Sequence, residues 1–182
     1  MSLTNYHIND LITLCKKNNQ LAQLEVYNRY YKAMYNTSLR IVKESAEAEN
    51  IMQDSFLKAF TKLNTLKTEA FGSWLKRIVI NDSIAYYRRK TKLNEIPLDD
   101  HLYKIEDENE ISEINIKPKI NELIATMNQL KESYRIAISL HLIEGYDYEE
   151  MSEILNLSNE NCRALVLRAK KSLRKKLGKN EK

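Results

Sequence analysis

Glycine and proline are scarce in this chain, with three glycines and two prolines among 182 residues. These two residue types supply the backbone conformations that tight turns and hairpins need, so a sheet-rich protein of this length would have too few of them. Leucine, lysine, glutamate, asparagine and isoleucine dominate the segments in between. The composition therefore predicts an all-α protein.

Apolar residues recur every three or four positions from Ile8 to Tyr87, which is typical of amphipathic helices. These positions are Leu11, Leu14, Cys15, Leu24, Tyr27, Tyr31, Met34, Tyr35, Ile51, Phe56 and Phe60. The same spacing returns after Pro118, at Ile120, Leu123, Ile124, Met127, Leu130, Ile136, Ile138, Leu140 and Leu142. Because each stripe is too short to bury its face alone, we expect the helices to pack into bundles.

Charge divides the chain into three parts. An acidic stretch carries Glu95, Asp99, Asp100, Glu106, Asp107, Glu108, Glu110 and Glu113 against one lysine, Lys104. Pro97 and Pro118 mark its ends, and a block of like charges tends to stay extended. We therefore predict two small helical domains, residues 1–94 and 118–182, joined by an acidic linker at 95–117.

Several classes of protein are disfavoured. Cys15 and Cys162 lie far apart without a CxxC partner, so the sequence predicts no disulfide framework and no metal site. The N-terminal segment lacks the apolar core of a signal peptide, and no stretch reaches the roughly 20 apolar residues that span a bilayer. Scattered histidines and the lack of a glycine-rich phosphate loop argue against an enzyme or a cofactor. We expect a soluble cytoplasmic protein without membrane insertion.

The segment EGYDYEEMSEILNLSNENCRALVLRAKKSLRKKL, residues 144–177, predicts a helix-turn-helix. Asp147 and Glu150 have the spacing of a capping box for a helix that ends near Leu155. Asn156 tolerates the left-handed conformation of a turn, and Ser158 can cap a second, cationic helix. A short helix, a short turn and a longer basic helix match the DNA-binding motif. An ordinary helical hairpin with a solvated basic end is the alternative.

At this point the chain resembles the sigma-70 family of bacterial RNA polymerase sigma factors, specifically the small extracytoplasmic-function (ECF) group. AENIMQDSFLKAF (48–60) resembles region 2.2, FGSWLKRIVINDSIAYYRR (71–89) resembles regions 2.3 and 2.4, and IEGYDYEEMSEILNLS (143–158) with the following helix resembles region 4. Three motifs in the family's order around a linker make the resemblance specific. It implies a polymerase subunit that recognises promoter minus-10 and minus-35 elements and assists strand opening.

The resemblance also implies partners. Region 2.2 of the family docks on the clamp of the polymerase largest subunit, and its motif falls here on Glu49, Asn50, Gln53 and Asp54. Region 4 of the family docks on the polymerase flap. Promoter DNA is the second partner, and family members commonly have an anti-sigma factor as well. From the residues alone, the acidic face near Asp54 is equally explained as a solvated surface.

For the minus-10 strand, the resemblance points to the helix from Trp74 to Arg89 and the loop before it. The candidates are Lys67, Thr68, Glu69, Lys76, Arg77, Asn81, Arg88, Arg89 and Lys90. We expect Asn81 and the loop to contact bases and the arginines to contact phosphates. Phe71, Leu75, Ile78 and Val79 fit a buried stripe, and Trp74 fits packing better than base stacking. Tyr86 and Tyr87 remain divided between core and strand contact.

For the minus-35 element, the candidates lie at the start of the second helix of the motif. They are Ser158, Asn159, Glu160, Asn161, Arg163, Arg168 and Lys171. Leu165 and Leu167 stand where the family often has Arg and His, which leaves fewer donors for base edges. One hypothesis is an additional DNA-targeting or activating protein that uses these leucines. We favour packing of both leucines against the preceding helix.

Three smaller points complete the sequence predictions. Ala85 and Lys131 depart from the family's usual Asp or Asn and proline at those positions. Cys162 is expected to be packed, with a reactive thiol at the helix start as the alternative. A stand-alone helix-turn-helix regulator and a sigma mimic that binds an anti-sigma factor are the competing functions, and the cations in both halves of the chain disfavour them.

Overall fold

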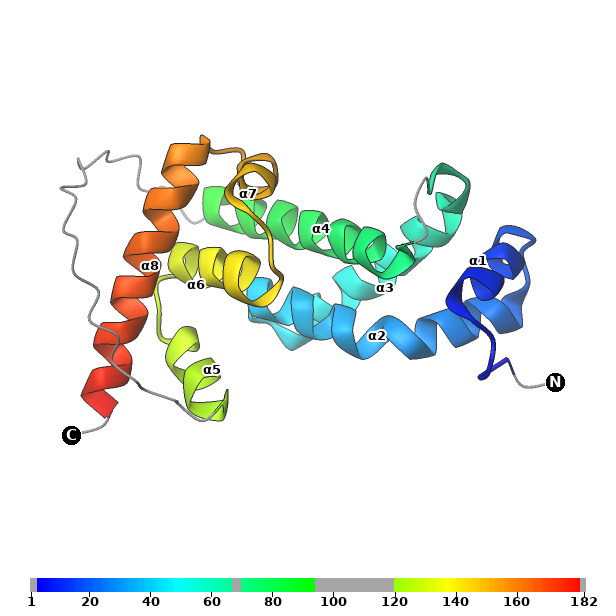
Figure 1. Cartoon of the computed structure of the whole chain (residues 1–182), viewed down its shortest axis with the longest axis horizontal. Helices are drawn as coiled ribbons and strands as arrows, with labels where there is room; N and C mark the ends of the chain where they lie inside the picture. The colour runs from blue at the N-terminus through cyan, green and yellow to red at the C-terminus, as the bar shows by residue number, and fades with distance from the viewer. Residues whose placement is uncertain (1–2, 67–69, 94–119, 181–182) are drawn as a thin grey trace. The chain divides into compact units, whose positions relative to one another are not determined.

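The structure is a computed structural model that describes residues 3–66, 70–93 and 120–180. Eight α-helices, a 3-10 turn and a π-helical turn account for its regular structure, and the described residues contain no strand. The all-α prediction is thus confirmed. The chain divides into two compact units, Met1–Asn94 and Glu95–Lys182, whose helices are labelled in Figure 1. The linker expected at 95–117 lies outside the described residues.

The first unit is built around one long central helix, α2. Its elements are α1 Ile8–Lys16, α2 Gln20–Val42, α3 Ser45–Thr61, η1 Leu63–Thr65 and α4 Phe71–Leu93. Helix α2 packs against α1, α3 and α4, and α3 packs against α4 (Figure 1). The side chain of Asn19 caps the start of α2, and Lys43 ends it in a left-handed conformation.

The core of the first unit collects the predicted apolar stripes. Leu11, Val26, Met34, Phe56, Phe71, Leu75 and Val79 are among its buried residues, and Ile78 and Trp74 pack against it. Ring contacts join the helices, with centroids 4.9 Å apart for Tyr27 and Phe56. The stripe prediction is wrong at Leu24, whose side chain is 56% exposed. Periodicity alone places Leu24 on the apolar face, but it does not determine whether another helix covers that residue, and Leu24 lies at the surface.

Helices α2 and α4 approach each other closely at two points. The Ser83 hydroxyl donates a buried hydrogen bond of 2.7 Å to the Val79 carbonyl and lies within hydrogen-bonding distance, 2.9 Å, of the Ser38 hydroxyl. Near the start of α4, a Cβ added to Gly72 would lie 2.8 Å from Cε1 of Tyr30. Small residues at both points allow the two helices to pack this tightly.

The second unit consists of shorter helices packed on the long final one. Its elements are α5 Ile120–Asn128, α6 Glu132–Ile138, the π-helical turn η2 Ser139–Ile143, α7 Tyr148–Leu155 and α8 Asn159–Asn180. Helices α5, α6 and α7 all contact α8, as Figure 1 shows. One core cluster of this unit contains Met127, Leu130, Ile138, Ala169, Leu173 and Leu177.

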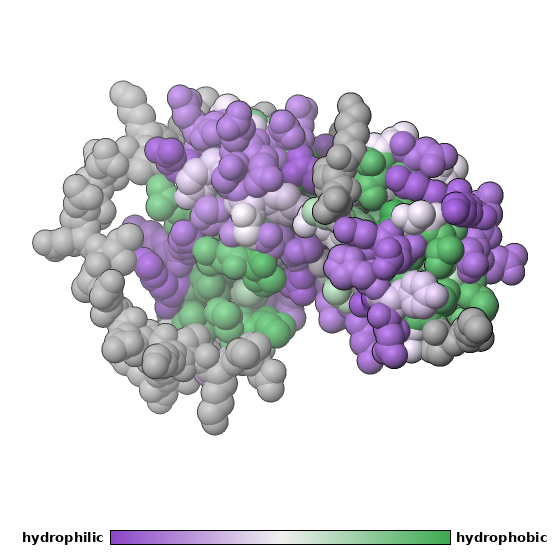
Figure 2. All heavy atoms as spheres, turned by 45° about the vertical axis from the view of Figure 1, so that its right-hand side comes forward, coloured by the Kyte–Doolittle hydropathy of each residue, from purple (hydrophilic) through white to green (hydrophobic). Residues whose placement is uncertain are grey.

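Some predicted stripe residues in the second unit lie at the surface. Ile124 and Leu142 are exposed, so their assignment to the core was wrong. The π-helical turn explains Leu142, because a wider turn shifts side chains out of the 3.6-residue register of α6. Figure 2 shows hydrophobic residues in patches on a mostly hydrophilic surface. In the described parts of the chain, none of the helices is both long and apolar enough to cross a membrane.

Candidate nucleic-acid interface

Helix α7 begins at the predicted capping box. The Glu150 amide donates to the Asp147 carboxylate at 2.8 Å, and the Asp147 amide donates to the Glu150 carboxylate at 3.0 Å. The two reciprocal bonds satisfy amide groups that the helix itself leaves without partners. The predicted end of this helix is also confirmed, because Leu155 is its last residue.

The turn between α7 and α8 has the predicted geometry. Asn156 adopts the left-handed conformation, with φ 48° and ψ 49°, and the Leu157 amide donates to the Ser152 carbonyl at 3.2 Å. Ser158 Oγ then accepts a hydrogen bond of 3.1 Å from the Asn161 amide. Helix α8 starts at Asn159. The tight turn and the two caps define the helix-turn-helix.

A ring contact that the sequence did not predict braces this motif. Nδ1 of His141 lies 2.9 Å from the Tyr146 carbonyl oxygen, and its ring stacks on Tyr148 at 4.8 Å. The guanidinium of Arg163 lies 5.4 Å from the centre of the same tyrosine ring. Such a cation–π contact contributes about 0.5–1 kcal/mol. Tyr148 therefore ties the turn before α7 to the first part of α8 and positions Arg163.

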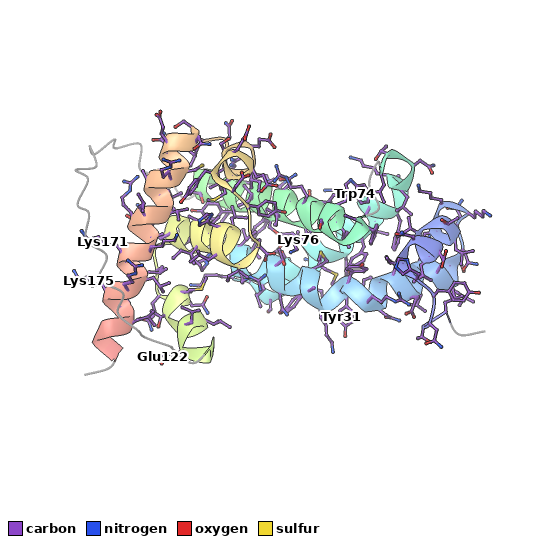
Figure 3. The ribbon with its side chains drawn as sticks, viewed as in Figure 1. Tyr31, Trp74, Lys76, Glu122, Lys171 and Lys175 are labelled. Carbon is purple, nitrogen blue, oxygen red and sulfur yellow. The ribbon has the colours of Figure 1, made fainter. Side chains whose placement is uncertain are left out.

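Helix α8 has a buried face and a cationic face. Cys162, Val166, Ala169, Leu173 and Leu177 are buried, at the three- and four-residue spacing of one helical stripe. The opposite face is exposed and carries the predicted residues Glu160, Arg163, Arg168 and Lys171. Ser158 and Asn159 are exposed as well, and Asn161 is half-buried. In Figure 3, Lys171 and Lys175 project from the same side of α8.

Cys162 belongs to the buried face. Its side chain is fully buried, and burial raises the pKa of the Cys162 thiol. A raised pKa disfavours the nucleophilic thiolate. Packing, the interpretation favoured from the sequence, is confirmed by this burial, and desolvation of the thiol argues against the reactive alternative.

Leu165 and Leu167 of α8 differ in their exposure. Leu165 is half-buried, whereas Leu167 is 43% exposed. The expectation that both pack against the preceding helix is therefore wrong for Leu167. Leu167 follows Leu165 by two residues, so its side chain points about 200° away from that of Leu165 around the helix axis. It therefore lies on a different face of α8.

The candidate residues of α4 lie on two separate faces. Arg77, Asn81 and Arg88 follow each other at spacings of four and seven, so they share one face of the helix. Asn81 is exposed, and Arg77 and Arg88 are half-buried. Lys76 and Lys90 lie at a spacing of fourteen on another side, and exposed Arg89 lies between the two faces. The cations of α4 thus do not form one continuous surface.

Lys90 is engaged by an acidic side chain. Its ammonium forms a salt bridge with Glu44, and the Tyr86 hydroxyl donates to the same carboxylate at 3.4 Å. The hydrogen bond from Lys90 lowers the pKa of the Glu44 carboxyl, which keeps Glu44 charged and the pair intact at neutral pH. This salt bridge could not be predicted from local sequence, because Glu44 lies at the start of α3, far from Lys90 along the chain.

The outward face of α3 carries the candidate partner-binding residues. Glu49, Asn50, Gln53 and Asp54 are all exposed, and Gln53 Nε2 donates to Glu49 Oε1 at 3.2 Å. Leu57 follows on the same face and is 66% exposed. Leu57 was not among the residues predicted for this face, although its spacing of four from Gln53 places it there. The face combines acidic, amide and apolar groups, and its negative charge is complementary to a basic partner surface rather than to nucleic-acid phosphates.

Two sequence predictions remain, one for the loop before α4 and one for the lack of a metal site. Lys67, Thr68 and Glu69 lie outside the described residues. Within the ranges that the structure describes, no group of three or more histidine, cysteine, aspartate or glutamate side chains is arranged to hold a metal ion.

Comparisons with known proteins agree with this arrangement. The family model of sigma-70 region 2 matches residues 26–93, and the model of sigma-70 region 4 matches residues 120–173. The ECF RNA polymerase sigma factor SigM of Bacillus subtilis is 26% identical, over 82% of this chain and 91% of its own length. SigW of the same organism is 28% identical, over 89% of this chain and 92% of its own length.

Among solved structures, the sigma factor RpoE in complex with the anti-sigma factor NepR from Bartonella quintana has a similar fold. The TM-score is 0.57 at 20% identity, and the match covers 85% of this chain and 95% of that one. Both family models match in chain order, one in each compact unit. The chain therefore belongs to the sigma-70 family of bacterial RNA polymerase sigma factors, in its extracytoplasmic-function group.

Proposed function

We propose that this protein acts in the cytoplasm as the promoter-specificity subunit of RNA polymerase. It binds the core enzyme, recognises minus-10 and minus-35 elements, and assists strand opening without covalent chemistry of its own. The outward face of α3, with Glu49, Asn50, Gln53 and Asp54, docks on the clamp of the largest subunit. Leu57 contributes an apolar contact at the end of that face.

The observation that carries this proposal is the helix-turn-helix of the second unit. Its caps and its left-handed turn hold α8 with one face buried and the opposite face cationic. Helix-turn-helix proteins insert the second helix into the major groove, where the side chains near its start reach base edges. We assign Asn159, Glu160 and Asn161 to the bases of the minus-35 element. Arg163, Arg168 and Lys171 contact phosphates or bases on either side.

On α4 we assign the face of Arg77, Asn81 and Arg88 to the minus-10 strand. Asn81 offers an amide that can read a base edge, and the two arginines flank it with positive charge. Trp74 packs on the core at the start of this face and supports it. Lys76, Arg89 and Lys90 contribute positive charge to neighbouring phosphates, with Lys90 weakened in that role by its pair with Glu44.

Binding to core RNA polymerase tests the proposal. The full chain is mixed with bacterial core enzyme, and complex formation is measured by size exclusion for the wild type and for the Gln53→Ala/Asp54→Ala variant. Gln129→Ala/Glu132→Ala is the matched control, because it removes one exposed amide and one exposed carboxylate from the second unit. We expect the first variant to bind weakly and the control to bind like the wild type.

A wild-type chain that does not bind its own core enzyme would refute the proposal. Binding to duplex DNA alone, with a steep salt dependence, would then indicate a stand-alone regulator. Capture of an anti-sigma factor without DNA binding would indicate a sigma mimic. An anti-sigma factor that covers the α3 face is a further partner we propose for the sigma factor itself, and it would compete with the core enzyme in the same assay.

A further inference from the structure

Leu167 is an apolar side chain on the outward face of α8. It is 43% exposed, and its neighbours along that face are Ala164 at a spacing of three and Lys171 at a spacing of four. Glu160 lies two turns earlier on the same side. The buried residues of α8 that the structure describes, Cys162, Val166, Ala169, Leu173 and Leu177, lie on the other side of the helix, so core packing does not explain why leucine stands here.

The surroundings of Leu167 identify the chemistry that it can meet. Arg163, Arg168, Lys171 and Arg174 are exposed around it, so the face attracts a polyanion. An apolar protein partner would have to bury these cations or supply acids for each of them. Duplex DNA satisfies the cations with phosphates on both sides of the major groove and places base edges between them.

One base presents an apolar group in the major groove. Thymine carries a C5-methyl there, whereas the other bases are distinguished by their hydrogen-bond donors and acceptors. Leucine has no donor or acceptor, so it can discriminate only through that methyl. Leu167 lies eight residues after Asn159, about 12 Å along the helix, a distance that keeps it within the stretch that a groove-bound helix presents to base pairs.

We propose that Leu167 is a specificity-determining residue that contacts the C5-methyl of a thymine in the upstream promoter element. This inference rests on the proposed function, because it needs α8 in the major groove of promoter DNA. Leu165 does not share the role, since it is half-buried on another side of the helix. The favoured upstream site then contains a thymine that Leu167 selects and that no polar side chain reads.

Replacement of thymine by deoxyuridine tests the contact, because deoxyuridine pairs identically and lacks only the methyl. Duplexes bound by the wild-type holoenzyme are first selected from a library randomised upstream of a constant minus-10 region. Each thymine of the selected upstream site is then replaced singly by deoxyuridine, and the affinity of the holoenzyme is measured. Burial of one methyl predicts a loss of about fourfold at one position.

Three variants separate the contact from general effects. Leu167→Ala should lose the sensitivity to that one methyl, and Leu167→Met should keep most of it. Leu142→Ala removes another exposed leucine of the same unit, in η2 rather than in α8, and should behave like the wild type. Because Leu167 is exposed, its substitution should leave the circular dichroism of the protein unchanged.

Two results would overturn the inference while leaving the proposed function intact. Either the wild type is insensitive to deoxyuridine at every upstream position, or Leu167→Ala retains the sensitivity. If the Leu167→Ala holoenzyme binds DNA as tightly as the wild type but no longer binds an accessory protein that the wild type binds, Leu167 contacts a protein partner instead of thymine. Failure to form a holoenzyme at all would refute both the inference and the function on which it rests.

Discussion

Substitution of Gly72 by alanine tests the close packing of α2 and α4. The new methyl would lie 2.8 Å from Cε1 of Tyr30, whereas carbon atoms in contact prefer about 3.5–4.0 Å. The Tyr30 ring cannot simply tilt away, because its edge also packs on Phe71 with centroids 5.5 Å apart. Overpacking of this kind costs about 1–3 kcal/mol, and the better helix propensity of alanine returns at most about 1 kcal/mol. With the full return subtracted, the first unit should lose up to about 2 kcal/mol.

Fluorescence of Trp74 measures this loss in the intact chain. The protein contains one tryptophan, and it packs on the core of the first unit, so its fluorescence during thermal unfolding reports that unit. We expect the thermal midpoint of Gly72→Ala to fall by roughly 4–8 °C for each kcal/mol lost. Gly178→Ala is the matched control, because a Cβ at Gly178 meets nothing within 4 Å. It should leave the Trp74 transition unchanged.

A second background tests the cause. In Tyr30→Leu protein the ring is gone, so Gly72→Ala should be neutral or stabilising there. An unchanged or raised midpoint for Gly72→Ala in the wild-type background would refute the packing argument. An equal fall of the thermal midpoint in both backgrounds would show that contact with the Tyr30 ring does not cause the destabilisation.

Three other predictions follow from contacts within each unit. Glu44→Gln should release Lys90 from its salt bridge and steepen the slope of log affinity for promoter DNA against log salt concentration by about 0.7–0.9. Glu25→Gln breaks a salt bridge on α2 instead and should leave that slope unchanged. Equal slopes in the wild type and both variants would contradict this prediction. Ser158→Ala removes the cap of α8 and should cost about 1 kcal/mol, seen as faster exchange of the amides at the start of that helix, and unchanged exchange would count against it. Burial raises the pKa of the Cys15 thiol to about 11, so at pH 8.5 the native protein should react with a thiol reagent on the order of a hundred times more slowly than the unfolded chain. Because the folded pKa exceeds the unfolded value of about 8.5, Cys15 stabilises the fold fully below pH 8.5, and this contribution should decline as pH rises toward 11. Rapid labelling of native Cys15 would contradict its burial.

Local physical rules explain why the helix-turn-helix could be predicted in detail. The capping box of Asp147 and Glu150, the left-handed turn at Asn156 and the cap at Ser158 all depend on neighbours within a few residues. Such interactions act within one or two turns of chain, so their geometry is encoded locally. The buried stripe of α4 was predictable for the same reason, because helical periodicity places Phe71, Leu75 and Val79 on one side.

Contacts between distant segments decided the rest. Periodicity assigns an apolar residue to a face, but only the packing of other helices determines whether that face is covered, which is why Leu24 and Leu167 are exposed while Cys162 is buried. The salt bridge between Lys90 and Glu44 joins residues far apart in sequence, so no local sequence pattern predicts it. The sequence alone thus determined the helices, their caps and the family. Tertiary packing decided which of their polar and apolar side chains remain available for DNA and for the polymerase, since availability depends on what the rest of the chain covers.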